Sequence, residues 1–227
     1  MKMWSGRFRQ PLDPEFEKWQ QSFRYDQRLL PFELAASRAH ARALEHAGVL
    51  SCEELSEILD GLNQIARHAK DSPEFLNDPG VEDVHHFVEK KLSVIIGATG
   101  YKLHAGRSRN EQIATDLRLF VRSTIDELQN ELGEWLDAIL TRAEEVGVAA
   151  MPGSTHLQPA EPVLVAHWLL AYVEMFLRDS ERLAACRKRA NLCPLGSGAI
   201  AGATVALDRR AMAAELGFED VTANSMD

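Results

Sequence analysis

The sequence has little cysteine, glycine and proline. Its three cysteines, Cys52, Cys186 and Cys193, are odd in number and contain no CxxC pair. A disulfide framework or a zinc ribbon is therefore excluded as the organising principle, and reduced thiols are typical of cytoplasmic proteins. With 14 glycines and 9 prolines among 227 residues, the chain is also poor in the turn residues of a β-sandwich or barrel.

An excess of positive charge is also missing. Lysine and arginine number 25 against 34 aspartates and glutamates, which gives a net charge of -9. A chain of this charge repels polyanions, so we expect no nucleic-acid partner. The length and the 45% hydrophobic content suit one or two globular domains with a sizeable core.

No apolar run is long enough for a membrane span. Residues 162–177 come closest, with Glu174 as their only formal charge, but a spanning helix needs about 20 residues. We expect this run to form a helix buried in protein. The N-terminal sequence MKMWSGRFRQ lacks the apolar region of a signal peptide. These absences predict a cytoplasmic protein without a membrane partner.

Helical signals fill the first part of the chain. Asp13 and Pro14 are typical of a helix cap and a first helical residue. Helices are predicted over residues 31–48, after the capping box of Ser51 and Glu54, and over residues 84–96.

Two long helices are predicted in the second part. Apolar residues recur every three or four positions over residues 108–146, which predicts a helix of about 60 Å at 1.5 Å per residue. A loop and a second helix over residues 162–191 follow, and a short helix lies near residues 208–217. Helices of this length are typical of bundles. No segment shows sustained strand alternation, so the sequence predicts an all-α fold.

The segment GRSRNEQIATDL combines a helix start with an arginine and an amide. Ser108 and Glu111 form a capping box, which places Arg109 and Asn110 in the first turn. Free backbone N–H groups and the helix dipole attract anions there, so this turn is a candidate carboxylate or phosphate site. The alternative is a solvated helix start whose arginines pair with surface acids.

The segment PGSTHLQPAEP places polar residues in the predicted loop between the long helices. It holds Thr155, His156 and Gln158. Histidine can both donate and accept a proton near neutral pH, so His156 is a candidate acid or base. The alternative is a loop histidine that is bonded only to backbone.

A third segment, VEDVHHFVEKKL, holds His85 and Glu89 four residues apart, after Asp83 as the predicted helix cap. Two ligands are too few for a metal, so we predict no metal site. A structural cap, or a histidine that orients a substrate-binding group, is favoured.

The glycine-rich segment LGSGAIAGAT does not match a dinucleotide fingerprint. Its glycines are spaced G-x-G-x-x-x-G and no strand is predicted before them. No cofactor is expected.

Together these motifs resemble the argininosuccinate lyase family. KLHAGRSRNEQIATDLRL is similar to its first signature and PGSTHLQPAEPVLVAHW to its second, while WSGRF, EDVHHFVEKKL and PLGSGAIAG resemble further motifs. The likeness is collinear over essentially the whole chain. It implies the fumarase/aspartase superfamily, whose members are helical tetramers built on a central bundle. The expected organisation is an N-terminal helical domain over residues 1–106 and part of a long-helix bundle over residues 107–227.

The resemblance also implies a reaction and a set of site residues. Argininosuccinate is cleaved to arginine and fumarate by β-elimination, without metal or cofactor. His156 matches the family's acid/base histidine. The residues expected to bind the substrate are Ser22, Ser108, Arg109, Asn110 and Thr155. Asp26, His85 and Gln158 are expected to support them.

Several positions depart from the family pattern. Glu111 stands for the usual Asp and Ala105 for Thr, while Ser154, Pro159 and Glu161 change the neighbourhood of His156. The third signature, GSSxMPxKxNP, does not occur in the sequence. It supplies the family's presumed catalytic serine and a substrate-binding lysine. We therefore expect an N-terminal fragment that is inactive alone.

Two alternatives remain at this point. The chain could belong to another lyase of the superfamily, acting on adenylosuccinate, aspartate or malate, although GRSRN and WSGRF disfavour this. It could also be a non-catalytic structural protein like the crystallins recruited from this family, although His156 and the GRSRN residues are retained.

Overall fold

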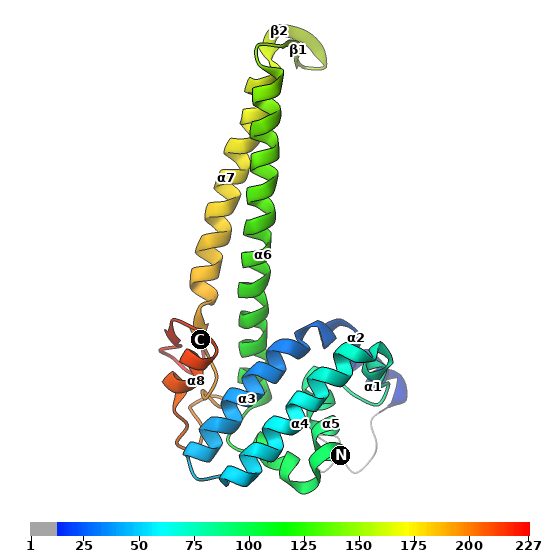
Figure 1. Cartoon of the computed structure of the whole chain (residues 1–227), viewed down its shortest axis with the longest axis vertical. Coiled ribbons are helices and arrows are strands. Elements are labelled where there is room, and N and C mark those ends of the chain that lie inside the picture. The colour runs from blue at the N-terminus through cyan, green and yellow to red at the C-terminus, as the bar shows by residue number, and fades with distance from the viewer. Residues whose placement is uncertain (1–12) are drawn as a thin grey trace. The chain divides into compact units, whose positions relative to one another are not determined.

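The computed structural model describes residues 13–227, and the WSGRF motif lies outside them. The chain forms two compact units (Figure 1). Unit 1 contains the described residues up to Leu117 together with Leu192–Asp227, and unit 2 contains Arg118–Asn191. Each unit is described by itself.

Unit 1 is built from short and medium helices. Caps that the sequence predicts begin several of them: the Asp13 side chain accepts from the amides of Glu15 and Phe16, and Ser51 and Glu54 form a reciprocal capping box. The helices are α1 (Pro14–Gln20), α2 (Phe23–Asp26), η1 (Gln27–Leu29), α3 (Leu30–His46), α4 (Cys52–Asp71), η2 (Pro73–Leu76), α5 (Val84–Ile96), η3 (Gly97–His104), the start of α6 (Arg109–Val146) and α8 (Arg209–Glu215).

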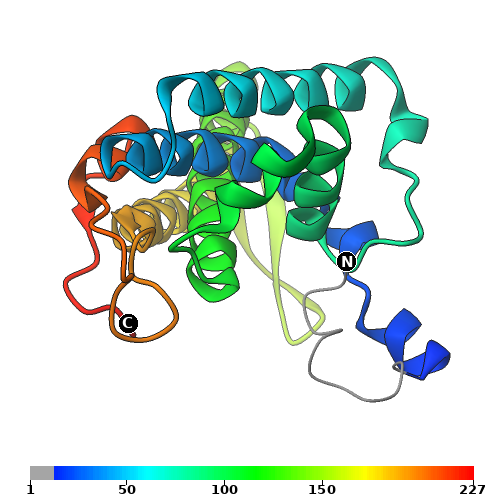
Figure 2. The same ribbon diagram turned by 90° about the horizontal axis from the view of Figure 1, so that it is seen from below.

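The core of unit 1 lies between α3, α4 and α5, which pack side by side (Figure 2). Phe87 of α5 is fully buried and stacks on Phe23, with ring centroids 4.8 Å apart. At Gly61 of α4, a Cβ atom would lie 2.6 Å from Leu92 Cδ1 of α5. The absence of a side chain at Gly61 therefore allows these two helices to approach closely.

The last residues of the chain are part of unit 1 and pack against its N-terminal helices. Strand β3 (Leu192–Cys193) pairs in parallel with β4 (Asp220–Val221), and Arg42 of α3 forms an ion pair with Glu215 of α8. The compact units thus group residues 192–227 and the first turns of α6 with the N-terminal helices. This grouping differs from a boundary between residues 106 and 107, and that division remains a prediction.

Unit 2 is a helical hairpin made of the rest of α6 and of α7 (Val165–Ala190). The two helices run antiparallel and side by side in Figure 1. Arg187 forms an ion pair with Asp126, Gln129 donates to the carbonyl of Ser180 at 3.2 Å, and Trp135 meets Phe176 edge to face. The prediction of long bundle helices is confirmed.

A β-hairpin joins the two long helices where the sequence predicts a loop. Strands β1 (Ala150–Thr155) and β2 (Gln158–Leu164) pair antiparallel, with a bulge between Pro152 and Ser154. The prediction that the second long helix begins at Pro162 is therefore wrong, because Pro162 lies in β2 and α7 begins at Val165. Both strands of a two-stranded sheet are edges, where prolines are tolerated.

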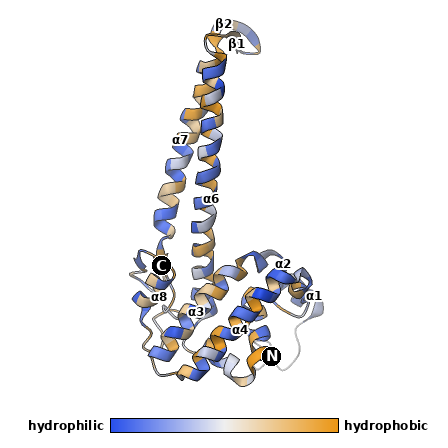
Figure 3. Ribbon diagram, viewed as in Figure 1, coloured by the Kyte–Doolittle hydropathy of each residue, from blue (hydrophilic) through white to orange (hydrophobic). Residues whose placement is uncertain are grey.

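Apolar side chains remain exposed on α7. Trp168, Leu170, Tyr172, Met175 and Leu177 are 40–48% exposed, and Figure 3 shows hydrophobic residues along the visible faces of α6 and α7. Most of residues 162–177 are thus exposed or only partly covered by the described residues, contrary to the expectation of burial, and Val173 is the buried exception. No helix within residues 13–227 combines the length and the apolar character that a membrane crossing requires.

Candidate functional site

The first cluster of predicted site residues lies where α2 meets the start of α5. The hydroxyl of Ser22 donates to Asp26 Oδ2 at 2.6 Å, and Asp26 Oδ1 accepts from the Val84 amide at 3.1 Å. Burial raises the pKa of Asp26, although the bond from Ser22 opposes this. Asp26 therefore connects Ser22 to the first turn of α5, which carries His85.

The start of α6 carries the second cluster. The Ser108 amide donates to Glu111 Oε1 at 2.9 Å, and the Ser108 hydroxyl accepts from the Asn110 amide at 3.3 Å. The predicted interaction of Ser108 with Glu111 is therefore present in one direction, while the serine oxygen bonds to Asn110 instead.

Arg109 extends from this turn toward α5 and is only 15% exposed. Its guanidinium lies 3.4 Å from Glu89 Oε2 and 3.8 Å from Asp83 Oδ2, and donates to Gln112 Oε1 at 3.2 Å. Glu89 also contacts His104 Nδ1 at 3.0 Å. Glu89 is thus committed to Arg109 and His104 and shares no site with His85.

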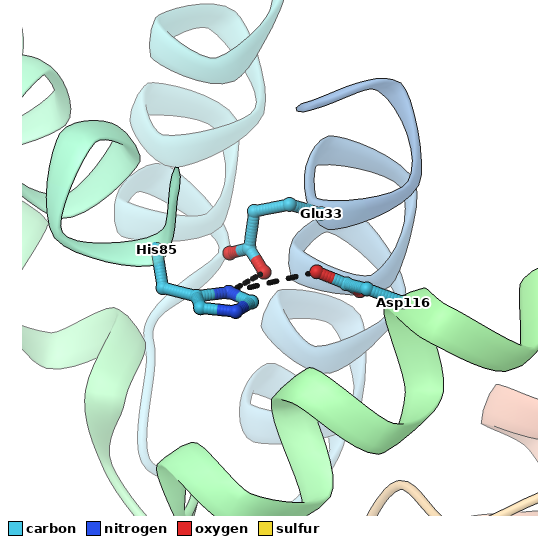
Figure 4. Close-up of side chains that lie close together, drawn as sticks. All are labelled: Glu33, His85 and Asp116. Carbon is cyan, nitrogen blue, oxygen red and sulfur yellow. Dashed lines mark hydrogen bonds and ion pairs between the residues drawn. The ribbon is translucent and has the colours of Figure 1, made fainter. Parts of the chain in front are cut away.

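His85 belongs to a separate cluster of buried polar side chains, which Figure 4 shows. Its Nδ1 is 2.8 Å from Glu33 Oε2 of α3 and 3.5 Å from Asp116 Oδ2 of α6. Glu33 Oε1 accepts from Ser37 Oγ and from Gln112 Nε2, each at 2.7 Å. Three helices thus converge on one carboxylate, and all these side chains are buried.

A buried arginine and a buried histidine adjoin this cluster. Arg107 Nη1 donates to Ser37 Oγ at 3.0 Å. His40 contacts the carbonyl oxygen of Ala105 through Nε2 at 3.0 Å. Burial, followed by the charge of Arg107, lowers the pKa of His40 to about 3. His40 is therefore neutral at pH 7 and its Nε2–H donates to this carbonyl, which fixes the segment before α6.

Asp116 differs from Glu33 in its hydrogen bonding. Neither of its oxygens accepts a hydrogen bond from a described donor. Burial raises the pKa of Asp116 well above its usual range, as do the charge of Glu33 and a hydrogen bond to it, against the opposing charges of Arg107 and Arg109. Burial and the neighbouring carboxylate thus favour the protonated form of Asp116.

Glu33, His85 and Asp116 are also residues of metal-ligand type. One ligand atom from each lies within 4.8 Å of the others. However, Glu33 Oε1 already accepts from Ser37 and Gln112, Oε2 contacts His85 Nδ1, and the pKa of Asp116 is raised. This arrangement suits a proton better than a divalent cation, which needs deprotonated ligands.

Thr155, His156 and Gln158 lie in unit 2, at the tip of the β-hairpin. Thr155 pairs with Gln158, which leaves His156 and Leu157 as a two-residue turn. Their φ angles are +51° and +60°, as a type I′ turn requires. All four side chains are exposed. The predicted site residues therefore divide into Ser22, Asp26, His85 and the first turn of α6 in unit 1, and this tip in unit 2.

Sequence reasoning missed Glu33, Gln112 and Asp116. The available signal is polar residues spaced four apart on helix faces that are otherwise apolar: Glu33 with Ser37 on α3, and Gln112 with Asp116 on α6. Such spacing identifies a shared face, although not the partner that it meets.

A family model described as "Lyase" matches residues 6–227. The chain is 64% identical over all of its 227 residues to an argininosuccinate lyase of Koribacter versatilis and covers 48% of that protein; an argininosuccinate lyase of Acidobacterium capsulatum is 58% identical with the same coverage. The chain thus spans about half the length of the curated relatives it matches.

Among solved structures, an EDDS lyase variant with bound fumarate aligns with 96% of this chain and 43% of its own. The TM-score is 0.77 at 28% identity. The helical organisation is accordingly of the fumarase/aspartase type. With a family model that covers nearly its entire length, the chain belongs to the lyase family.

Proposed function

We propose that this chain forms part of an argininosuccinate lyase, which releases fumarate and arginine by β-elimination. The observation that carries the proposal is the start of α6, where Arg109, flanked by Ser108 and Asn110, lies 3.8 Å from Asp83, the cap of the helix that carries His85. The name of the 64% identical relative gives the substrate.

The chemistry requires donors around a substrate carboxylate. A base removes a proton from the carbon next to this carboxylate, which then carries the extra charge as an aci-carboxylate. The C–N bond breaks as the double bond of fumarate forms, and the leaving guanidino nitrogen takes up a proton. Backbone amides of the first α6 turn, with the Arg109 and Asn110 side chains, are suited to stabilise such a dianion.

His156 is assigned proton transfer, with Thr155 as a substrate contact and Gln158 in support. A histidine and a leucine both at positive φ are unusual, since asparagine and glycine normally occupy such turns. Residues held in sparsely populated backbone regions cluster at active sites. The conformation of the hairpin tip therefore supports a functional role for His156.

The proposal is tested with a chimaera in which this chain replaces the matching half of the Koribacter versatilis relative. The chimaera is expected to release fumarate from argininosuccinate, whereas the 227-residue chain alone is expected to release none. Fumarate is measured by its ultraviolet absorbance. A chimaera that folds and assembles yet leaves argininosuccinate intact would contradict the proposal. Adenylosuccinate and aspartate are supplied in parallel, and faster turnover of either would favour the other superfamily lyases.

We further propose that the parent enzyme is a cytoplasmic homotetramer and that the exposed apolar side chains of α7 are covered by other copies. This chain is then expected to self-associate in sedimentation velocity experiments, because contiguous exposed apolar surface favours association. Leu170→Glu should shift the distribution toward the monomer. Arg182→Glu, on the charged part of the same helix, is the matched control. A monomer at all concentrations would contradict the expectation.

A further inference from the structure

Glu33 and Asp116 have no part in the reaction as proposed above, yet both contact His85. Glu33 is fully buried, its Oε1 accepts from Ser37 Oγ and Gln112 Nε2, and its Oε2 faces His85 Nδ1. A carboxylate has no proton to donate. The contact of 2.8 Å between Glu33 Oε2 and His85 Nδ1 therefore requires that Nδ1 carries the hydrogen.

The remaining ring nitrogen of His85 has a different environment. Among residues 13–227 the structure gives Nε2 no hydrogen-bond partner, whereas Nδ1 has Glu33 and Asp116. In a neutral imidazole one nitrogen donates and the other accepts. With the hydrogen on Nδ1, the lone pair lies on Nε2, on the side of the ring away from Glu33 (Figure 4).

Asp116 is the second carboxyl group that lies close to Nδ1 of His85. Its Oδ2 lies 3.5 Å from the same Nδ1. A second ionised carboxyl at this distance would add a buried negative charge next to Glu33. Burial and the charge of Glu33 both raise the pKa of Asp116, against the charges of Arg107 and Arg109, so the cluster favours Glu33 as the carboxylate that faces Nδ1.

We propose that Glu33 is a positioning residue that holds His85 in the Nδ1–H tautomer and leaves Nε2 as a proton acceptor. A catalytic use of that acceptor rests on the proposed function, whereas the tautomer itself does not. The arrangement matches the way in which buried carboxylates orient histidines in other active sites.

The test is nitrogen-15 NMR of the histidine rings in the 227-residue chain, with His85 assigned by the signal lost in His85→Gln. At neutral pH, Nδ1 of His85 is expected to carry the proton and Nε2 to show the shift of an unprotonated ring nitrogen. A proton on Nε2 in the unsubstituted chain would overturn the proposal.

Glu33→Gln provides the sharper measurement. Ser37 and Gln112 both donate to the Oε1 position, so the new amide oxygen belongs there and the amide NH₂ faces Nδ1. His85 must then accept at Nδ1, and its proton is expected to move to Nε2, with the two nitrogen shifts exchanged. Retention of Nδ1–H in a folded variant would overturn the role of Glu33.

Asp116→Asn is the matched control within the same cluster. The amide reproduces the shape and neutrality of a protonated acid, so the Nδ1–H tautomer is expected to persist. Loss of that tautomer would mean that Glu33 does not hold it by itself and would overturn the proposal. If Glu33→Gln does not fold, the unsubstituted chain and Asp116→Asn decide.

Addition of zinc tests whether the cluster of Glu33, His85 and Asp116 binds a metal instead. The His85 ring signals are expected to stay in place with one equivalent of Zn²⁺. A shift of these signals that Asp116→Asn abolishes would assign the cluster to metal binding and overturn the proposal. Because none of these measurements uses turnover, an inactive chimaera would count against the proposed function and leave the tautomer assignment standing.

Discussion

His156→Asn in the chimaera is expected to lower the rate of fumarate release by about 10²–10⁴-fold, the usual contribution of a positioned acid or base. Asparagine preserves polarity and tolerates the left-handed backbone at φ +51°, so the turn should remain intact. It cannot exchange protons near neutral pH. The measurement is the initial rate of fumarate absorbance at saturating argininosuccinate.

Leu157→Asn is the matched control for this prediction. Leu157 has φ +60° and its side chain is 98% exposed. The substitution therefore places the same residue type in the same turn without removing a titratable group. Its rate should remain within a few-fold of the unsubstituted chimaera. Equal losses in both variants would attribute the effect to the turn and would contradict the acid/base role of His156.

Phe87→Ala is expected to lower the free energy of unfolding of unit 1 by about 3–5 kcal/mol, the range for deletion of a fully buried aromatic side chain. Phe87 has no exposed surface, stacks on Phe23 and meets Phe75 edge to face at 5.4 Å between ring centroids. Its removal leaves a cavity between α5 and its neighbours. Urea denaturation followed by circular dichroism provides the measurement.

Val94→Ala serves as the control on the same helix. Val94 is 78% exposed, so the substitution removes little buried surface and should change the free energy of unfolding by less than about 0.5 kcal/mol. Similar losses for Phe87→Ala and Val94→Ala would mean that the core around Phe87 contributes less than its burial implies.

The helices of this chain were the most predictable part of its fold. The helix predicted over residues 84–96 is observed as Val84–Ile96, and that predicted over residues 108–146 as Arg109–Val146. Caps and apolar periodicity are local properties that a single sequence displays. The hairpin escaped prediction because its strands contain Pro152, Pro159 and Pro162, and because its turn lacks the usual Asn-Gly signal.

The candidate site was predictable only in part, for a physical reason. Ser108, Arg109, Asn110 and His85 stand in motifs that a sequence shows directly. Glu33, by contrast, lies 52 residues from His85 and 79 residues from Gln112 along the chain. Their meeting depends on how three helices pack, and no local pattern in α3 specifies which helix face it will meet.

The buried acid at Asp116 has a consequence for the coupling between folding and protons. An aspartate in an unfolded chain titrates near pH 3.9 (about the model-peptide value), whereas burial and Glu33 raise the folded-state pKa of Asp116 well above this. Between these two values the folded chain holds a proton that the unfolded chain has released. Folding there takes up a proton, so this group's contribution to stability is complete below the unfolded pKa and is lost as the pH rises through the folded value. Asp116 itself thus contributes most to stability on the acid side of this window, whereas the lowered pKa of the adjoining His40 acts in the opposite sense.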